Sequence, residues 1–255
     1  MGSLMYNINE HSAYVPPKGK IIIYWLGGAG FLCVFDNGSR ICIDPYLSDS
    51  VERLVGFKRL CKAPVSAFQL IFDVLLISHE HGDHLDIDSF DLLMRINPNC
   101  TVIAPAGCRE YLKNKCINQT IVSAGQMVAI QNHRITAVSA DHGELSPTAI
   151  GFVISFGKRS MYFTCDTGYN EQLLRPAVDM KPDIVVPCIN GAFGNMDEEQ
   201  AAILAAKCEA KTAVPAHYGL FKEHGGNAVK FAEHLQRISP QTGVELLQVG
   251  FGKEL

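Results

Sequence analysis

The chain has 255 residues, of which 47% are hydrophobic and 19% charged, and its formal net charge is −4. These proportions are typical of a globular protein that buries a substantial core, and the acidic balance argues against a partner such as polymeric nucleic acid. Nine cysteines without a Cys-x-x-Cys pair do not suit a disulfide framework.

The hydropathy of the chain bears on its location and its division into domains. No apolar run is long enough to span a bilayer, and the chain does not open on the apolar segment of a signal peptide. Together with the scattered cysteines, this predicts a cytoplasmic protein without a membrane partner. Because no Pro/Ser-rich linker or block of charge divides the chain, we expect one domain over residues 1–255, with residues 1–19 as a loosely ordered polar stretch.

Apolar runs separated by turn residues predict the strands. In the first half they fall at residues 30–35, 40–43, 74–77 and 101–105. In the second half they fall at residues 151–156, 160–165, 183–189 and 212–216. Each half opens on a hairpin that ends in an aspartate, Asp44 in the first and Asp166 in the second. The repeated order predicts two similar halves.

Helical patterns lie between the predicted strands, at residues 86–96, 109–115, 197–210 and 227–238. The most regular of them, 197–210, has an acidic first turn, an Ala/Leu face and a lysine near its end. Strands and helices alternate in both halves. This alternation predicts an α/β fold with a layered helix–sheet–sheet–helix arrangement.

A dense group of metal-ligand side chains follows the apolar strand at residues 74–77. Three histidines and an aspartate stand within six positions, as His79, His81, Asp83 and His84. On an extended or tightly turning backbone, His79 and His81 point the same way and can hold one cation, and Asp83 and His84 can hold a second. Imidazole nitrogen and carboxylate oxygen are ligands of Zn²⁺, Mn²⁺ and Fe²⁺. The pattern therefore predicts a metal site.

Further ligand candidates stand just past the ends of later predicted strands, as His142, Asp166 and His217. Rigid sheets commonly place functional side chains on loops at their strand ends. The alternative is that His142 and His217 are loop histidines bonded to nearby carbonyls. Of the remaining histidines, we expect His133 to be solvated at a hairpin turn, and His11 and His234 to lie at the surface.

With these residues in view, the chain resembles the metallo-β-lactamase superfamily of metal-dependent hydrolases. The HxHxDH motif of the family is present as His79, His81, Asp83 and His84, and its other metal positions match His142, Asp166 and His217. The resemblance implies a four-layer αββα sandwich that holds two divalent ions, Zn²⁺ or Mn²⁺. It puts His79, His81 and His142 on one ion, Asp83, His84 and His217 on the other, and Asp166 between them. Asp83 and Asp166 are then the candidate catalytic carboxylates, and Asp44 orients a ligand histidine.

Three short stretches narrow the resemblance: Trp25-Leu26-Gly27, His84-Leu85-Asp86 and Gln248-Val249-Gly250. They are similar to L-ascorbate-6-phosphate lactonase and its hydrolase relatives, which implies hydrolysis of a small anionic sugar lactone by a metal-bridged hydroxide. A phosphodiesterase or nuclease of the same fold is the alternative, followed by a redox di-iron protein. Asp86 either contacts the residues around the metals or caps a helix.

Contacts with a small-molecule substrate are predicted from position alone. Asn190 and Tyr218 follow strands of the second half and are expected to face the metals. Four cations between Arg53 and Lys62 either form a lid that grips an anionic substrate or belong to a solvated face. The sequence leaves the oligomeric state open, a homo-oligomer included.

Overall fold

The computed structural model describes residues 5–115 and 118–255. The chain divides into two compact units. Unit 1 contains the residues up to Ala104, Cys108–Ile121 and Leu247–Leu255, and unit 2 contains Pro105–Gly107 and Val122–Leu246. Each unit is built on one β-sheet.

The sheet of unit 1 has eight strands in the spatial order β1-β15-β2-β3-β4-β5-β6-β7. Along the order β1-β15-β2-β3-β4 each strand is antiparallel to the next, and along β4-β5-β6-β7 each strand is parallel to the next. The strands are β1 (Met5–Asn7), β2 (Ile21–Gly27), β3 (Gly30–Phe35), β4 (Arg40–Ile43), β5 (Val74–Leu76), β6 (Thr101–Ala104), β7 (Asn118–Ile121) and β15 (Phe251–Glu254).

The sheet of unit 2 has seven strands in the order β14-β13-β12-β11-β10-β9-β8. Strands β8 to β11 are antiparallel, and β11 to β14 run parallel. The strands are β8 (Met127–Ile130), β9 (His133–Ser139), β10 (Ile150–Phe156), β11 (Arg159–Cys165), β12 (Ile184–Pro187), β13 (Thr212–Ala213) and β14 (Gly243–Val244).

The predicted repetition of the two halves is confirmed in the strand pairing. In unit 1 an antiparallel hairpin, β3–β4, is followed by β5 and β6 in parallel on one side of it. In unit 2 the hairpin β10–β11 is followed by β12 and β13 in the same manner. Parallel strands place their carboxyl ends at one edge of a sheet, and this edge is where α/β folds place functional loops.

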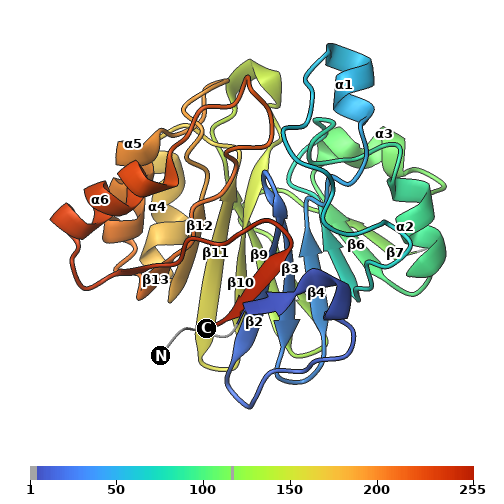
Figure 1. Ribbon diagram of the computed structural model, residues 1–255, viewed down its shortest axis with the longest axis horizontal. Helices are drawn as coiled ribbons and strands as arrows, with labels where there is room; N and C mark the ends of the chain where they lie inside the picture. Colours follow the sequence, from blue (N-terminus) through green and yellow to red (C-terminus); the bar gives the residue numbers. More distant parts are fainter. Residues whose placement is uncertain (1–4, 116–117) are drawn as a thin grey trace. The chain divides into compact units, whose positions relative to one another are not determined.

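Helices cover each sheet. In unit 1 they are α1 (Ser50–Val55), α2 (Phe90–Ile96) and α3 (Arg109–Leu112). In unit 2 they are α4 (Glu171–Asp179), α5 (Glu198–Lys207) and α6 (Ala228–Ile238), which Figure 1 shows gathered beside β11, β12 and β13. Short 3₁₀ turns occur at Ile8–Glu10, Ala106–Cys108 and Gly143–Leu145. No helix in the described ranges combines the length and the apolar character that crossing a membrane requires.

The start of α5 follows from a local signal in the sequence. The Asp197 carboxylate accepts a hydrogen bond from the backbone N–H of Gln200, and the Gln200 side chain accepts one from the N–H of Asp197. This reciprocal pair satisfies donors that the first turn of a helix leaves without partners. The helix then buries Ala201, Leu204 and Ala205 in the core of unit 2.

Three parts of the secondary structure differ from what the sequence analysis predicted. The helix predicted from residue 86 begins at Phe90, because the Asp86 carboxylate is bonded to the backbone N–H groups of Leu47 and Ser48. Helix α4 was not predicted, since it contains Pro176 in its interior. Of the N-terminal stretch predicted to be loose, residues 1–4 lie outside the described residues, and residues 5–19 include β1, which pairs with β15, and Ile8, which is fully buried.

Two histidines expected near solvent are buried. His11 lies in the core of unit 1, where its Nδ1 is 2.6 Å from the carbonyl oxygen of Ile8 and its Nε2 accepts a hydrogen bond from the N–H of Ile71. His133 is also buried because, on β9, it shares the inward face of the strand with Ile135 and Ala137. The prediction that these two side chains are solvated is wrong.

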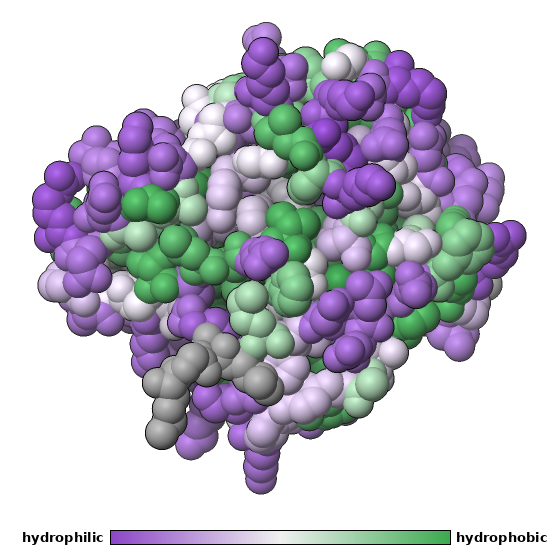
Figure 2. Space-filling model, in the orientation of Figure 1, coloured by the Kyte–Doolittle hydropathy of each residue, from purple (hydrophilic) through white to green (hydrophobic). Residues whose placement is uncertain are grey.

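An apolar patch lies on α6 and the segment after it. Val229 and Leu246 are about half exposed, and they border a groove with Ala232 and Val244. Figure 2 shows apolar side chains gathered in this region. Exposed patches of this kind are typical of contact surfaces. A homo-oligomer remains a prediction for this protein.

Candidate functional site

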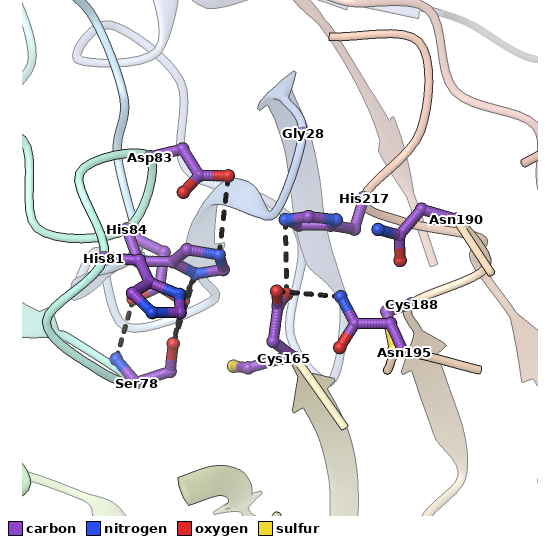
Figure 3. Close-up of polar contacts among 12 residues, drawn as sticks. Gly28, Ser78, His81, Asp83, His84, Cys165, Cys188, Asn190, Asn195 and His217 are labelled. Atoms are coloured by element: carbon purple, nitrogen blue, oxygen red, sulfur yellow. Dashed lines mark hydrogen bonds and ion pairs between the residues drawn. The ribbon is translucent and has the colours of Figure 1, made fainter. Parts of the chain in front are cut away.

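In unit 1, the HxHxDH motif forms two adjacent pairs directly after β5. His79 and His84 are fully buried, and His81 and Asp83 are partly exposed. Nε2 of His79 lies 2.8 Å from Nδ1 of His81, and Nε2 of His84 lies 3.7 Å from an Oδ of Asp83. Figure 3 shows the Asp83 carboxylate facing the His84 ring. The motif therefore presents His79 with His81 and Asp83 with His84.

A buried hydrogen-bond network fixes His84. Asp44, which ends the β3–β4 hairpin, is fully buried and accepts hydrogen bonds from the N–H of Ser78 at 2.8 Å and from its hydroxyl at 2.5 Å. The other partner of the Asp44 carboxylate is Nδ1 of His84, at 2.8 Å. Because this contact occupies Nδ1, it leaves Nε2 of His84 directed at Asp83, where it can bind a metal ion.

In unit 2, three side chains converge on the Asp166 carboxylate. Nε2 of His217 lies 3.2 Å from Oδ1 of Asp166, and Nε2 of His142 lies 3.8 Å from Oδ2. Oδ2 also accepts a hydrogen bond from the Asn195 side chain at 2.8 Å. Dashed lines in Figure 3 mark the contacts of His217 and Asn195. His142, Asp166 and His217 are all buried, so their ligand atoms are held in fixed positions.

Unusual backbone conformations accompany these residues. Asp44, Cys165, Phe193 and His217 have positive φ angles of 42°, 53°, 55° and 60°. Left-handed backbone is strained for side chains other than glycine and asparagine, and such strain persists where the surrounding structure requires it. Here Asp44 and His217 carry candidate functional side chains and Cys165 precedes Asp166, whereas other residues with positive φ, such as Lys181 and Glu209, lie just after the ends of α4 and α5.

The loops of unit 2 that carry His142, Asp166 and Asn195 are bonded to one another. The N–H of Gly168 donates to the carbonyl of Asp141 at 2.7 Å, and the N–H of Met196 donates to the carbonyl of Thr167 at 2.9 Å. Gly168 permits this approach because a Cβ atom at that position would lie 2.8 Å from the carbonyl oxygen of Gly194. The loops therefore form one rigid support.

Sequence reasoning missed two polar residues around these clusters, Asn195 and His224, and left the role of Asp86 open between two alternatives. Asp86 accepts hydrogen bonds from Leu47, Ser48, Ser50 and Asp88 and so anchors the loop that follows Asp44. Asn195 orients Asp166, and the His224 ring stacks on His217 with centroids 4.6 Å apart. Asp86 was recognisable from its place beside the motif. Asn195 and His224 had no comparable signal, because neither directly follows a strand.

The predicted substrate contacts have mixed placements. Asn190 is buried, and its Oδ1 has no hydrogen-bond partner among the residues that the structure describes. Tyr218 packs against the helix-side core of unit 2, and burial raises the pKa of its hydroxyl to about 12. Arg53 pairs with Asp88 at 2.6 Å, and Arg59 donates to backbone carbonyls of Tyr46, Ser48 and Cys61. These two cations are therefore engaged within unit 1. His234 is partly exposed on α6, as expected.

The chemistry of the donor set fits a divalent cation. Two nitrogens bound to one Zn²⁺ are about 3.3 Å apart in tetrahedral geometry, close to the separation between His79 and His81. The candidate ligand groups that the described residues bring together are imidazoles and carboxylates. Cys188 is buried nearby, and burial, and secondarily the charge of Asp166, raise the pKa of its thiol to about 12.

Comparison with known proteins identifies the family. A model of the β-lactamase superfamily domain matches residues 39–218. A metal-dependent hydrolase of Methanosphaera stadtmanae is 29% identical over 227 residues, which cover 84% of this chain and 91% of that protein.

Solved structures share the fold. A metallo hydrolase from the archaeon Ignicoccus hospitalis superposes with a TM-score of 0.73 at 20% identity, covering 92% of this chain and 98% of that one. A metallo-β-lactamase fold protein from Bacillus subtilis superposes with a TM-score of 0.68 at 16% identity, covering 93% and 100%. The chain thus has the α/β metallo-β-lactamase fold and belongs to the β-lactamase superfamily, and the relatives it matches include metal-dependent hydrolases.

Proposed function

We propose that the two clusters together form a dinuclear metal centre that hydrolyses a small lactone or related carboxylic ester. In this proposal one ion is held by His79, His81 and His142, and the other by Asp83, His84 and His217, with Asp166 between them. Two divalent ions held there would supply a hydroxide nucleophile, because metal binding lowers the pKa of water toward neutrality. Zn²⁺ and Mn²⁺ both suit the mixed imidazole and carboxylate ligands.

One observation carries the proposal: each cluster contains a ligand whose orientation is fixed by a buried partner. In unit 1, Asp44 holds Nδ1 of His84 at 2.8 Å and directs Nε2 toward Asp83. In unit 2, Asn195 holds one oxygen of Asp166 at 2.8 Å, while the other faces His217. Partners of this kind orient metal ligands and fix the tautomer of a histidine.

The carboxylates have a further role in the proposed reaction. Asp83 is partly exposed, with 15% of its side chain accessible, whereas Asp166 is nearly buried. Asp83 can therefore reach solvent and accept a proton from the attacking water or return it to the leaving alcohol. The hydrogen bond from Asn195 holds the orientation of Asp166 as the substrate is converted to product.

The substrate class rests on the loops and on the subgroup resemblance. The loop after His142 reaches the next strand, β10, at Ile150. Loops of this length leave room for a small polar molecule and build no long groove. A sugar lactone is the substrate we propose, and a phosphodiester is the alternative that the same residues can serve.

The test is a comparison of kcat/KM for sugar lactones and for bis-p-nitrophenyl phosphate with protein reconstituted with Zn²⁺ or Mn²⁺. We expect the lactones to be preferred. Asp166→Ala serves as the inactive control and His234→Ala as the matched surface control. A preference for the phosphodiester would reject the lactonase proposal and favour the alternative. Absence of hydrolysis in every reconstituted sample would reject the proposed metal centre as a hydrolytic site.

A further inference from the structure

A cavity in unit 2 lies directly beside His142. Its volume is about 470 Å³, within the range of pockets that bind small molecules. Its walls come from the loops after β9, β11 and β12, and its lining residues are Asp141, His142, Gly143, Glu144, Leu145, Gly168, Tyr169, Phe193 and Gly194. One candidate metal ligand therefore opens onto a space large enough for part of a substrate.

The walls of this cavity are held in place by the backbone. Gly168 is bonded to Asp141 and stands too close to Gly194 for any side chain, as described above. The loop around Phe193 is closed on itself, because the N–H of Gly191 donates to Met196 at 2.9 Å and the N–H of Asn195 donates to Ala192 at 3.0 Å. The cavity thus exists without rearrangement of the loops.

Two large apolar side chains border the cavity and remain exposed. Leu145 is 55% exposed and Phe193 is 46% exposed. Phe193 also has left-handed backbone, and its ring packs edge-on against His224 with centroids 5.9 Å apart. Exposed apolar surface and backbone strain both cost stability, so a function is the simplest reason for keeping them together at one place. With Tyr169 they supply an apolar wall.

The charges of the side chains that line this cavity disfavour anionic groups. Asp141 and Glu144 are acidic, and none of the lining residues that the structure describes is lysine or arginine. Away from a cation held by His142, an anionic group placed here would face the Asp141 and Glu144 carboxylates, and this proximity disfavours it. An uncharged group meets no such penalty, and its apolar surface gains contact with Leu145 and Phe193.

We propose that this cavity is the selectivity pocket of the enzyme and binds an uncharged, apolar group of the substrate. The inference rests on the proposed function, because it takes His142 as a ligand of the reacting centre. It refines the expected substrate: an anionic group, if the substrate carries one, lies outside this cavity. Leu145 and Phe193 favour apolar groups through contact, and the charge of Glu144 disfavours anionic groups.

The test compares three esters with one leaving group on metal-loaded protein: p-nitrophenyl acetate, p-nitrophenyl butyrate and mono-p-nitrophenyl succinate. The butyrate and succinate differ mainly in the terminal carboxylate. We expect kcat/KM for the butyrate to exceed that for the succinate by about tenfold or more, the discrimination that an apolar pocket commonly provides. A preference for the succinate would overturn the proposal.

Variants localise the effect. Leu145→Ala and Phe193→Asn should lower the butyrate-to-acetate ratio of kcat/KM about threefold to tenfold. Asparagine is chosen because it tolerates the left-handed backbone of Phe193. Glu144→Lys should raise the succinate-to-butyrate ratio by a similar factor. Met127→Ala, which removes an equally exposed apolar side chain from β8, is the matched control and should leave the ratios unchanged. Unchanged ratios in all three pocket variants would reject the assignment.

A binding measurement separates this proposal from the proposed function. If no ester is hydrolysed, the hydrolytic assignment fails, and the pocket is then tested with the uncharged ligand 4-phenylbutan-1-ol by protein NMR. Shifts of the Leu145 methyl groups and of the Gly143 and Gly194 amides, lost in Phe193→Asn, would support the pocket. Shifts confined to other regions, or no shifts at all, would overturn it.

Discussion

Asp44→Asn should weaken metal binding about 10- to 100-fold without unfolding the protein. The Asp44 carboxylate is fully buried and accepts three hydrogen bonds, two from Ser78 and one from His84. Asparagine keeps the oxygen that faces the Ser78 N–H but presents an NH₂ group to Nδ1 of His84. The Ser78 hydroxyl can rotate to accept from that NH₂ group, whereas a His84 that must keep Nε2 free for a metal cannot.

The magnitude follows from the single bond that is lost. A hydrogen bond to a charged group contributes about 1.5–3 kcal/mol. Since about 1.4 kcal/mol corresponds to a factor of ten, the loss predicts roughly 10- to 100-fold weaker binding, the range found for partners of metal-bound histidines. Backbone strain adds nothing, because asparagine tolerates the φ of 42° at this position as readily as aspartate.

The assay is competition for Zn²⁺ with a chromogenic chelator, combined with circular dichroism to show that the variant is folded. Asp49→Asn is the matched control: Asp49 lies five residues further on, is exposed, and makes no capping hydrogen bond to α1. A folded Asp44→Asn protein with wild-type Zn²⁺ affinity would refute the reasoning. So would an equal loss of affinity in Asp49→Asn.

Three further predictions concern the metals, the bridging carboxylate and pH. Elemental analysis of protein reconstituted with Zn²⁺ or Mn²⁺ should find about two ions per chain, and a stoichiometry near zero would contradict the ligand assignment. Asp166→Ala should lose nearly all hydrolytic activity with little change in Tm, because Asp166 is not part of the apolar core, whereas His234→Ala should match the wild type in both. Burial lowers the pKa of His11 below its ordinary value of 6.5, so its contribution to stability is complete above that pH and is lost as the pH falls through the folded-state pKa. The Tm measured from pH 8 to pH 5 should therefore fall less in His11→Gln than in the wild type, and an equal fall would show that His11 is not the titrating group.

Local patterns predicted the parts of the site that depend on neighbours in sequence. His79 with His81, and Asp83 with His84, are close because they share one turn after a strand that its apolar residues make recognisable. The strands of the two repeated hairpins and those that follow them, β3 to β6 and β10 to β13, were predicted within a few residues, since alternation and turn residues directly encode them. Strands β1, β2, β7, β8, β14 and β15 were not predicted. The metal-binding motif and the repeated halves thus needed no tertiary information.

Contacts between distant segments were not predictable in the same way. Asn195 reaches Asp166 across 29 residues only because the loop after β12 turns back on itself. His11 is buried because Ile8 and Ile71 offer it a hydrogen-bond acceptor and a donor, and nothing in a polar N-terminal stretch indicates either partner. Burial of a polar side chain depends on what surrounds it in space, and composition does not reveal this.

The position of β15 has a consequence for synthesis of the protein. Residues 251–254 lie between β1 and β2 and pair with both, so a strand that is translated after unit 2 completes the sheet that β1 and β2 begin. All strands of unit 2 are translated before it. Until then β1 has no partner and the edge of β2 stays open, and open strand edges are prone to pairing with other chains. Removal of residues 251–255 should leave nascent unit 1 in that aggregation-prone state.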